Sequence, residues 1–327
     1  MPDATIRDVA RKANVSVASV SRALNGLENV SEKTRKRVAE AALQLGYVPH
    51  AGARSLSLAR THAVGVVLPD LHGEFFSEIV RGMDREAGRR GYLLLLSTLH
   101  PGHGTSVLAA LRGRVDGLIV MAPHLDVDEL AAALPRALPA LLINTRGIPG
   151  GHPAIHIGNA AGVKVVMDHL IGLGRRRLIH IAGPSDNIDA QERAEVFRTA
   201  AEAAGCEFEI VAGDFSEESG EAAVAALLGK GAEFDAIFGA NDNMAIGALQ
   251  SLRSAGVRVP EDVVVAGFDD IPLARHVGLT TVRVRIAELG ERAIARLVAG
   301  LESKELGGSE EIMEPELIVR STTQLEF

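Results

Sequence analysis

The sequence predicts a small all-α head of helix-turn-helix type, followed by an α/β body built from two Rossmann-like lobes. Three observations lead to this fold class. The first 48 residues carry apolar positions at helical spacing, with polar residues that can cap short helices. From Ala63 onward, continuous apolar runs alternate with amphipathic stretches, which is typical of parallel strands connected by helices. The 327 residues are enough for one large unit and a small one.

The head is expected to contain three helices. Each follows a residue whose side chain can act as an N-cap: Thr5, Ser16 and Ser31. In the second helix, Val17, Val20 and Leu24 form the stripe that we expect to be buried. Two short helices joined by a tight turn and braced by a third form a helix-turn-helix unit.

A linker is expected between the head and the body. The segment from Ala51 to Leu58 has helical propensity but is too short to be a stable helix alone, so it would order only when something supports it. The predicted division is therefore a helix-turn-helix domain at 1–48, a hinge helix and linker at 49–62, and a two-lobed body at 63–327.

The strands of the body are predicted from apolar runs short enough to be buried strands. These runs are 63–69, 92–98, 117–122, 140–145, 178–183, 236–240 and 263–268. The amphipathic stretches between them include 74–90, 159–173, 190–204 and 243–255. The body has room for about eleven such strands, which two lobes accommodate more readily than one sheet. Both faces of these sheets should be covered by helices.

The charge is distributed unevenly along the chain. The net charge is −8, but residues 1–62 contain ten Lys and Arg against five Asp and Glu, a net of +5. A basic head on an acidic body suits DNA binding at one end, although a solvated basic face would give the same count. Cys206 is the single cysteine, which suits a reducing compartment. With no secretory leader and no run of about 18 apolar residues, we expect a cytoplasmic, nucleoid-associated protein with no membrane contact.

Several ordered motifs resemble the lactose/galactose-repressor (LacI/GalR) family. In the head and linker they are Thr5–Ala10, Asn14–Asn25, Val30–Arg35, Leu45–Pro49 and Ala53–Leu56. In the body they are Asp116–Ile119, Gly239–Ala245, Val265–Asp270 and Leu279–Val282. The resemblance covers nearly the whole chain. It implies a DNA-binding transcription repressor controlled by a small-molecule effector, with a body like that of periplasmic sugar-binding proteins and assembly into dimers or tetramers.

The second helix of such a head lies in the DNA major groove. The side chains expected to reach base edges are Val17, Ala18, Ser21 and Arg22. Val17 and Ala18 offer methyl groups to thymine, whereas Arg22 has the donor fork for guanine. Val17 could instead belong to the core. By resemblance, a further set would hold phosphates: Thr5, Ser16, Asn25, Ser31, Thr34 and Tyr47.

The resemblance also assigns a role to the linker. In the family the residue that matches Leu56 enters the minor groove at the operator centre and kinks the duplex, and Ala53 is small enough to permit close approach. Because Val17 and Ala18 resemble galactose-type heads, we expect a pseudopalindromic double-stranded operator with a central CG step, bound by a homodimer or tetramer.

An effector would bind in the cleft at the carboxyl ends of the strands. Candidate residues that follow predicted strands or match family positions are Asp70, Phe75, Phe76, Asn144, Arg146, Arg193, Phe215, Asn241 and Asp269. An Asn or Asp at such a position can instead cap the next helix, and Asp242 is the clearest case.

Gln191 departs from the family pattern, because many members carry an effector-gripping arginine there. Glutamine has no charge, so an anionic effector is less favoured unless Arg146 or Arg193 replaces that arginine. We therefore expect a sugar or a nucleoside. The alternative is a family regulator controlled by a protein partner, such as a phosphoprotein.

Two other classes of protein are disfavoured. The sequence contains none of the phosphate-loop, zinc-protease or serine-hydrolase motifs, so we expect no enzyme, no cofactor and no metal site. A free-standing exported sugar-binding protein would need an export signal and would lack the basic head.

Overall fold

The computed structural model describes residues 4–25, 27, 29–48, 60–99, 105–145 and 151–324. The chain forms two compact units, residues 1–63 with 113–116, and residues 64–112 with 117–327. Residues 49–59 of the predicted linker lie outside the described residues, so the hinge helix stays a prediction. None of the helices in the described ranges is long and apolar enough to cross a membrane.

The first unit contains the three expected helices, α1 (Ile6–Ala13), α2 (Val17–Leu24) and α3 (Glu32–Leu45). The three predicted N-caps are confirmed. The Thr5 side chain accepts from the Asp8 amide while the Asp8 carboxylate accepts from the Thr5 amide, which is a capping box. Ser16 and Ser31 each accept from the amide three residues further on, over 3.1 and 3.3 Å.

The core of this unit is small and made of short side chains. Val9, Val20 and Val38 are fully buried, and alanines from all three helices fill the space between them. The prediction that Val17 lies on the buried stripe is wrong, because 42% of its surface is exposed. Val17 is the first residue of α2, one turn before Val20, and the buried core does not extend as far as Val17. The buried residues of α2 are Val20 and Ala23.

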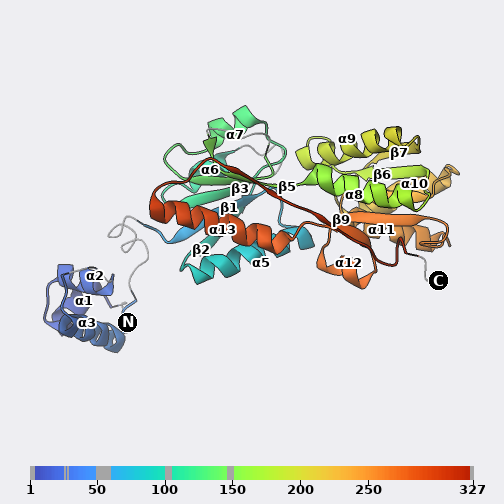
Figure 1. Ribbon diagram of the computed structural model, residues 1–327. Coiled ribbons are helices and arrows are strands. Elements are labelled where there is room, and N and C mark those ends of the chain that lie inside the picture. Colours follow the sequence, from blue (N-terminus) through green and yellow to red (C-terminus); the bar gives the residue numbers. More distant parts are fainter. Residues whose placement is uncertain are drawn as a thin grey trace. The chain divides into compact units, whose positions relative to one another are not determined.

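The body contains two six-stranded sheets, each covered by helices (Figure 1). The first has the order β11-β5-β4-β3-β1-β2. Its strands are β1 (Ala63–Leu68), β2 (Leu93–Thr98), β3 (Gly117–Met121), β4 (Ala140–Ile143), β5 (Ala154–Ile157) and β11 (Glu310–Met313). Its helices are α5 (Glu74–Arg89), α6 (Ser106–Ala110), α7 (Val127–Ala133) and α13 (Ile286–Ser303). We call this part the first lobe.

The second lobe has the strand order β12-β10-β9-β8-β6-β7. Its strands are β6 (Arg177–Ala182), β7 (Glu207–Ala212), β8 (Ala236–Gly239), β9 (Val264–Asp269), β10 (Thr280–Arg283) and β12 (Glu316–Ile318). Its helices are α8 (Asn159–Gly172), α9 (Ile188–Ala203), α10 (Glu217–Gly229), α11 (Asp242–Ser254) and α12 (Pro272–His276). β12 pairs antiparallel with β10, whereas the other pairings in this sheet are parallel.

The chain passes between the two lobes three times. It crosses after β5, after β10 and after β11, so the second lobe is inserted between parts of the first (Figure 1). A cleft between the lobes is therefore bounded by segments that are far apart in sequence. The predicted pair of α/β lobes is confirmed.

All seven apolar runs form strands, but one of them is not buried. β2 is an edge strand, and Leu93, Leu95 and Leu96 are 75%, 40% and 42% exposed. The prediction that helices cover both faces is wrong for this strand. Five short strands were not predicted, because they are brief or alternate polar with apolar residues, as Glu207 and Glu209 do in β7.

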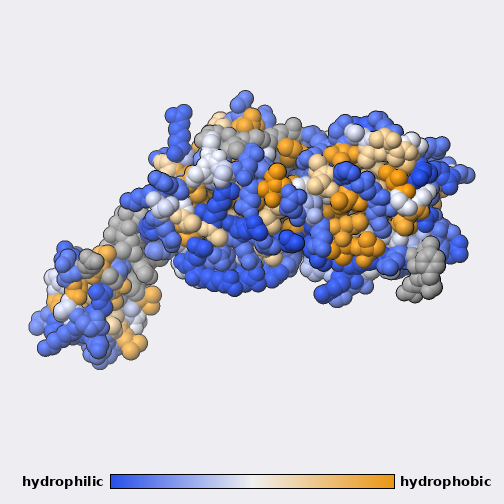
Figure 2. Space-filling model, in the orientation of Figure 1, coloured by the Kyte–Doolittle hydropathy of each residue, from blue (hydrophilic) through white to orange (hydrophobic). Residues whose placement is uncertain are grey.

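Two glycines allow α5 and α13 of the first lobe to approach closely. A Cβ at Gly82 would overlap the carbonyl oxygen of Ala287, and a Cβ at Gly290 would overlap the carbonyl oxygen of Ile79. The start of α13 is thus fixed against α5 by backbone contact. On the face shown in Figure 2, the surface over these two helices is largely hydrophilic.

Candidate functional sites

The exposed face of α2 presents the four residues predicted to read bases. Val17, Ala18 and Arg22 are exposed and Ser21 is half-buried. They lie at i, i+1, i+4 and i+5, on the side of the helix away from Val20. Among the described residues, none is paired with Arg22, so its guanidinium is available to an external acceptor. A helix docked in the major groove presents such a face to the base edges.

The residues predicted to hold phosphates lie near the starts and ends of the three helices. Thr5, Ser16 and Ser31 are exposed N-caps, so each stands beside free amide groups at a helix N-terminus. Asn25 is the C-cap of α2, and Thr34 and Tyr47 are half-buried. Helix N-termini with hydroxyl groups suit phosphate contact. Ala53 and Leu56 lie outside the described residues.

A cavity of about 340 Å³ lies between the two lobes of the body. Most of the predicted effector residues line it: Asp70, Phe75, Phe76, Asn144, Arg193, Phe215, Asn241 and Asp269. Five of them end or follow strands of the two sheets, as expected for α/β lobes, whereas Phe75 and Phe76 come from α5 and Arg193 comes from α9. Arg146 lies outside the described residues.

Three residues of this cavity have a backbone conformation that side chains rarely adopt. Their φ angles are 46° at Asn144, 73° at Phe215 and 117° at Asp269. Strain of this kind costs on the order of 1–3 kcal/mol per residue and is concentrated at functional sites. The fold maintains it here at three points that all line the same cavity.

Arg193 is the centre of a buried polar network on the second-lobe side of the cavity. Only 4% of its surface is exposed. Its guanidinium lies on the Phe268 ring, donates to the carbonyl oxygen of Ala240 over 2.5 Å and donates to Asn159 Oδ1 over 2.9 Å. The Asp269 carboxylate lies 3.9 Å away. Each of these contacts fixes the plane of the guanidinium.

Asp189 connects this network to the first lobe. Its carboxylate accepts from Asn159 Nδ2 over 2.7 Å and from Asn144 Nδ2 over 3.2 Å. Asn144 follows β4 in the first lobe, whereas Asp189 is in the first turn of α9. Asp189 is therefore a polar bridge across the base of the cavity. It was not predicted, although its place at the start of the helix that follows β6 could have suggested it.

Asp269 has an unusual acidity. Burial raises the pKa of its carboxyl to about 7, Arg193 opposes the increase, and the charge of Asp189 adds to it. Near neutral pH both protonation states are therefore populated, so the group can accept or donate a hydrogen bond. This property suits a ligand that carries hydroxyl groups.

From the sequence, Asn241 and Asp242 could each bind the ligand or cap the helix that follows. Asn241 is the N-cap of α11 through the Met244 amide (3.0 Å), and it also donates to the Phe215 carbonyl oxygen (2.9 Å). Asp242 does not line the cavity. Its fully buried carboxyl accepts from the Ile271 amide and from the Thr281 hydroxyl, and burial raises its pKa well above the usual value. The cap is Asn241, and Asp242 supports the turn that follows β9.

Gln191 is exposed and is not among the residues that line the cavity. Its side-chain amide donates to the Ser185 carbonyl oxygen over 2.5 Å. Arg193, two residues on, provides the guanidinium of the cavity instead. Further polar lining residues that were not predicted are His72, His124, Asp186, Asn187, Asp189, Asp214, Ser216 and Asn243. No group of histidine, cysteine or acidic residues in the described ranges could hold a metal ion.

Two sequence profiles match separate parts of this chain. One, for bacterial regulatory proteins of the lacI family, matches residues 5–50. The other, for a periplasmic binding protein-like domain, matches residues 167–323. The HTH-type transcriptional repressor CytR of Escherichia coli K12 is 32% identical over 329 residues, which cover 98% of this chain and 96% of the relative. The chain belongs to the lacI family.

Other members of the lacI family match at similar levels. The transcriptional regulator CelR of Thermobifida fusca is 37% identical over 90% of both chains, and the ribose operon repressor of Escherichia coli K12 is 35% identical over 90% of this chain and 92% of the relative. The predicted family is confirmed, and with it a DNA-binding transcription regulator, not an enzyme.

Solved structures of lacI-family proteins share the fold. A Lac repressor dimer bound to operator and the anti-inducer ONPF has a TM-score of 0.88 at 28% identity, covering 98% of this chain and 99% of that chain. A CelR–cellobiose complex has a TM-score of 0.73 at 33% identity with the same coverage. A helical head with two α/β lobes of periplasmic-binding-protein type is thus the confirmed fold.

Proposed function

We propose that this protein is a transcription repressor whose affinity for operator DNA is set by an uncharged polyhydroxylated ligand, a sugar or a nucleoside, bound between the lobes. The cavity around Asp269 is the observation that carries the proposal. It combines aromatic walls at Phe75, Phe76 and Phe215 with amide and carboxyl groups at Asn144 and Asp269. Rings and hydroxyl groups need this combination of an apolar wall and planar polar groups. The CelR relative was solved with cellobiose.

The charge of the cavity favours an uncharged ligand. Its lining contains five aspartates: Asp70, Asp186, Asp189, Asp214 and Asp269. The described lining contains one guanidinium, Arg193, and its donors are already directed at Ala240 and Asn159. Partial burial lowers the pKa of His124, which keeps that ring neutral at pH 7. An anionic ligand would therefore lose hydration without gaining a free cation.

Operator binding is assigned to the exposed face of α2, with Arg22 directed at a guanine and Val17 and Ala18 at thymine methyl groups. The site would be pseudopalindromic with a central CG step, where Leu56 enters the minor groove. These details follow from the family resemblance and from the exposure of Val17. The protein would act in the cytoplasm, bound to the nucleoid.

A homodimer would present two heads to such a site. The edge strand β2 supports this assembly, since Leu93 and Leu95 on one face and Leu96 on the other are exposed beside the unpaired edge of the sheet. The Lac repressor relative was solved as a dimer on its operator. Tetramers would require a further contact surface.

Control by a protein partner was suggested by Gln191. Because Gln191 does not line the cavity, its lack of charge has no bearing on a ligand held there. The cleft ligand is therefore the better-supported signal.

Calorimetric titration of the protein with a panel of sugars and nucleosides tests the proposal. We expect one member to bind saturably and to change operator affinity, and Phe215→Ala to weaken that binding without affecting operator binding by the free protein. If no member of the panel binds saturably while operator binding is intact, the result would contradict a small uncharged effector and would favour the protein partner.

A further inference from the structure

A second cavity in the body adjoins the effector cleft and shares Asp269 with it. Its volume is about 870 Å³, which is within the range of small-molecule sites. The lining comes from α5, the end of β9 and the turn after it, α12, β10, the first half of α13 and the segment after β12. Six arginines line it: Arg85, Arg275, Arg283, Arg285, Arg292 and Arg320.

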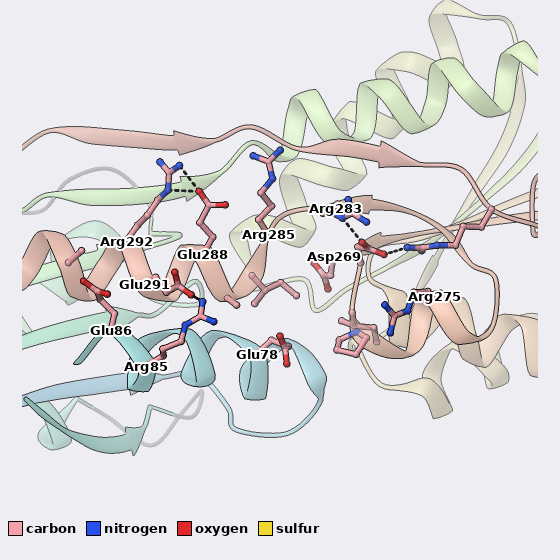
Figure 3. Close-up of a pocket in the computed structure, with 17 residues that line it drawn as sticks. Glu78, Arg85, Glu86, Asp269, Arg275, Arg283, Arg285, Glu288, Glu291 and Arg292 are labelled. Atoms are coloured by element: carbon pink, nitrogen blue, oxygen red, sulfur yellow. Dashed lines mark hydrogen bonds and ion pairs between the residues drawn. The ribbon is translucent and has the colours of Figure 1, made fainter. Parts of the chain in front are cut away.

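At one end of this cavity, each carboxylate is already neutralised by an arginine. The pairs are Glu78–Arg81, Glu86–Arg90, Glu288–Arg292 and Glu291–Arg85. Figure 3 shows Glu86, Glu288 and Glu291 with Arg85 and Arg292 on this side. The charges within each pair cancel, so this end has little net charge with which to attract a ligand.

The other end carries an excess of positive charge. Figure 3 shows Arg275, Arg283 and Arg285 there, near Asp269. With Arg320 we call them the arginine end. Arg283 and Arg320 both contact Asp270, each over 2.6 Å.

The other two arginines of this end, Arg275 and Arg285, have no close carboxylate partner among the residues that the structure describes. Glu316 lies 3.9 Å from Arg285 and 3.7 Å from Arg283. No carboxylate in the described part of the chain lies within ion-pair distance of the exposed Arg275. Asp269, which also lines this cavity, is matched by Arg193 on the side of the cleft. The four guanidinium groups of the arginine end therefore face Asp270 and Glu316, which leaves two positive charges uncompensated.

The backbone adds donors at the same place. The 18-residue helix α13 begins beside the arginine end, and its N-cap, Arg285, has a left-handed φ of 47° and makes no side-chain cap. Within the described ranges, no acceptor is bonded to the amides of Ile286 and Ala287. Free amides and the helix dipole strengthen the field that the arginines already establish.

We propose that the arginine end binds a small dianion, either a phosphate monoester or inorganic phosphate, as a second ligand of this regulator. Guanidinium groups match phosphate oxygens in geometry and charge, and two uncompensated charges match a dianion. The volume leaves room for the organic part of an ester. The adjoining cleft, with its five aspartates, would reject the same ligand, so the two cavities select ligands of different charge.

Calorimetric titration of the full-length protein with glycerol 3-phosphate and with inorganic phosphate, in a phosphate-free buffer at neutral pH, tests the proposal. We expect saturable binding of one dianion per chain. Arg275→Gln with Arg285→Gln should weaken it on the order of tenfold or more, because charge-assisted hydrogen bonds are lost. Tighter binding of the ester than of phosphate would identify an organic ligand, whereas equal binding would identify phosphate itself.

Two control variants locate the site. Arg85→Gln with Glu291→Gln removes one matched ion pair from the neutralised end without changing its net charge, and Phe215→Ala alters only the cleft. Both should retain affinity for the dianion within about twofold. If the double variant of the arginine end does not fold, Arg275→Gln alone serves, since it breaks no ion pair among the described residues. Absence of saturable binding to either probe, or equal loss in both double variants or in Phe215→Ala, would overturn the proposal.

Discussion

The guanidinium carbon of Arg193 lies 3.8 Å from the centroid of the Phe268 ring. Phe268 is fully buried in β9, one residue before Asp269. Arg193 therefore packs on the strand that carries Asp269, the cleft residue with the strained backbone. Its positive charge also balances the charge of the Asp269 carboxylate. We therefore expect one side chain to affect both the packing of the second lobe and the binding of the proposed ligand between the lobes.

Arg193→Met should destabilise the protein as well as weaken ligand binding. The substitution leaves Asn159 and Asp269 without their buried partner, which costs about 3 kcal/mol of the free energy of unfolding. Urea denaturation measures this loss. Arg198→Met is the matched control, because Arg198 is on the exposed side of the same helix and pairs with Glu195, so a change within about 0.5 kcal/mol is expected. Equal effects of the two substitutions would contradict the network.

The contribution of Asp269 to stability should decline as pH rises. Its pKa is about 7 in the folded protein against 3.8 as the ordinary value, so between these values the folded state binds more protons than the unfolded state. The free energy of unfolding of the native protein, minus that of Asp269→Asn, should therefore fall by about 1.4 kcal/mol per pH unit from about pH 4 to pH 7. It should be constant at higher pH.

The difference between the two proteins is the proper readout. His180 is fully buried and its pKa is lowered to about 4, so its contribution to stability rises over part of the same pH range and would mask the decline. Asp269→Asn leaves His180 in place, and the subtraction removes its contribution. A difference that does not change with pH would show that Asp269 titrates normally.

Gly82→Ala and Gly88→Ala should have opposite effects, although both glycines are in α5. A Cβ at Gly82 overlaps the Ala287 carbonyl oxygen, whereas nothing lies within 4 Å of one at Gly88. Gly82→Ala should lower the melting temperature, corresponding to about 1–3 kcal/mol. Gly88→Ala should raise stability by up to about 1 kcal/mol, because alanine favours a helix. Two effects of the same sign would count against close packing of α5 on α13.

Leu93→Lys should dissociate the proposed homodimer. Leu93 is 75% exposed on the edge strand β2, and a charge there would have to lose its hydration in an apolar interface. Sedimentation should show dimers for the native protein and monomers for Leu93→Lys, with operator affinity reduced. Ile312→Lys is the control, since Ile312 is 59% exposed on β11, the opposite edge of the same sheet. Dissociation by Ile312→Lys alone would place the dimer contact elsewhere.

Features that depend on local sequence could be predicted. Thr5, Ser16 and Ser31 are recognisable as caps because the amides they bind are three residues away. The apolar runs identified seven strands because each run is itself a short, continuous stretch of sequence. By contrast, Asp189 meets Asn144 and Asn159 only after 45 and 30 residues of chain fold back. No local pattern encodes that contact.

The predictions that were wrong also concern features that depend on tertiary structure. Val17 has helical spacing to Val20, but whether a first-turn residue is covered depends on the neighbouring helices. β2 has the composition of a central strand, yet its place at the sheet edge is set by topology. The arginine end combines α12, β10, α13 and the segment after β12, so its charge is visible only in three dimensions.

We expect the head to select a particular DNA site under the control of a ligand bound in the cleft. Selection of bound duplexes from a random pool, with and without the best ligand of the titration panel, tests it most directly. We expect an enriched palindrome whose recovery changes with the ligand. Arg22→Ala should relax base preference, at a cost of about 1–3 kcal/mol at one position in each half-site. The absence of any enriched palindrome, or enrichment that the ligand and Arg22→Ala both leave unchanged, would contradict it.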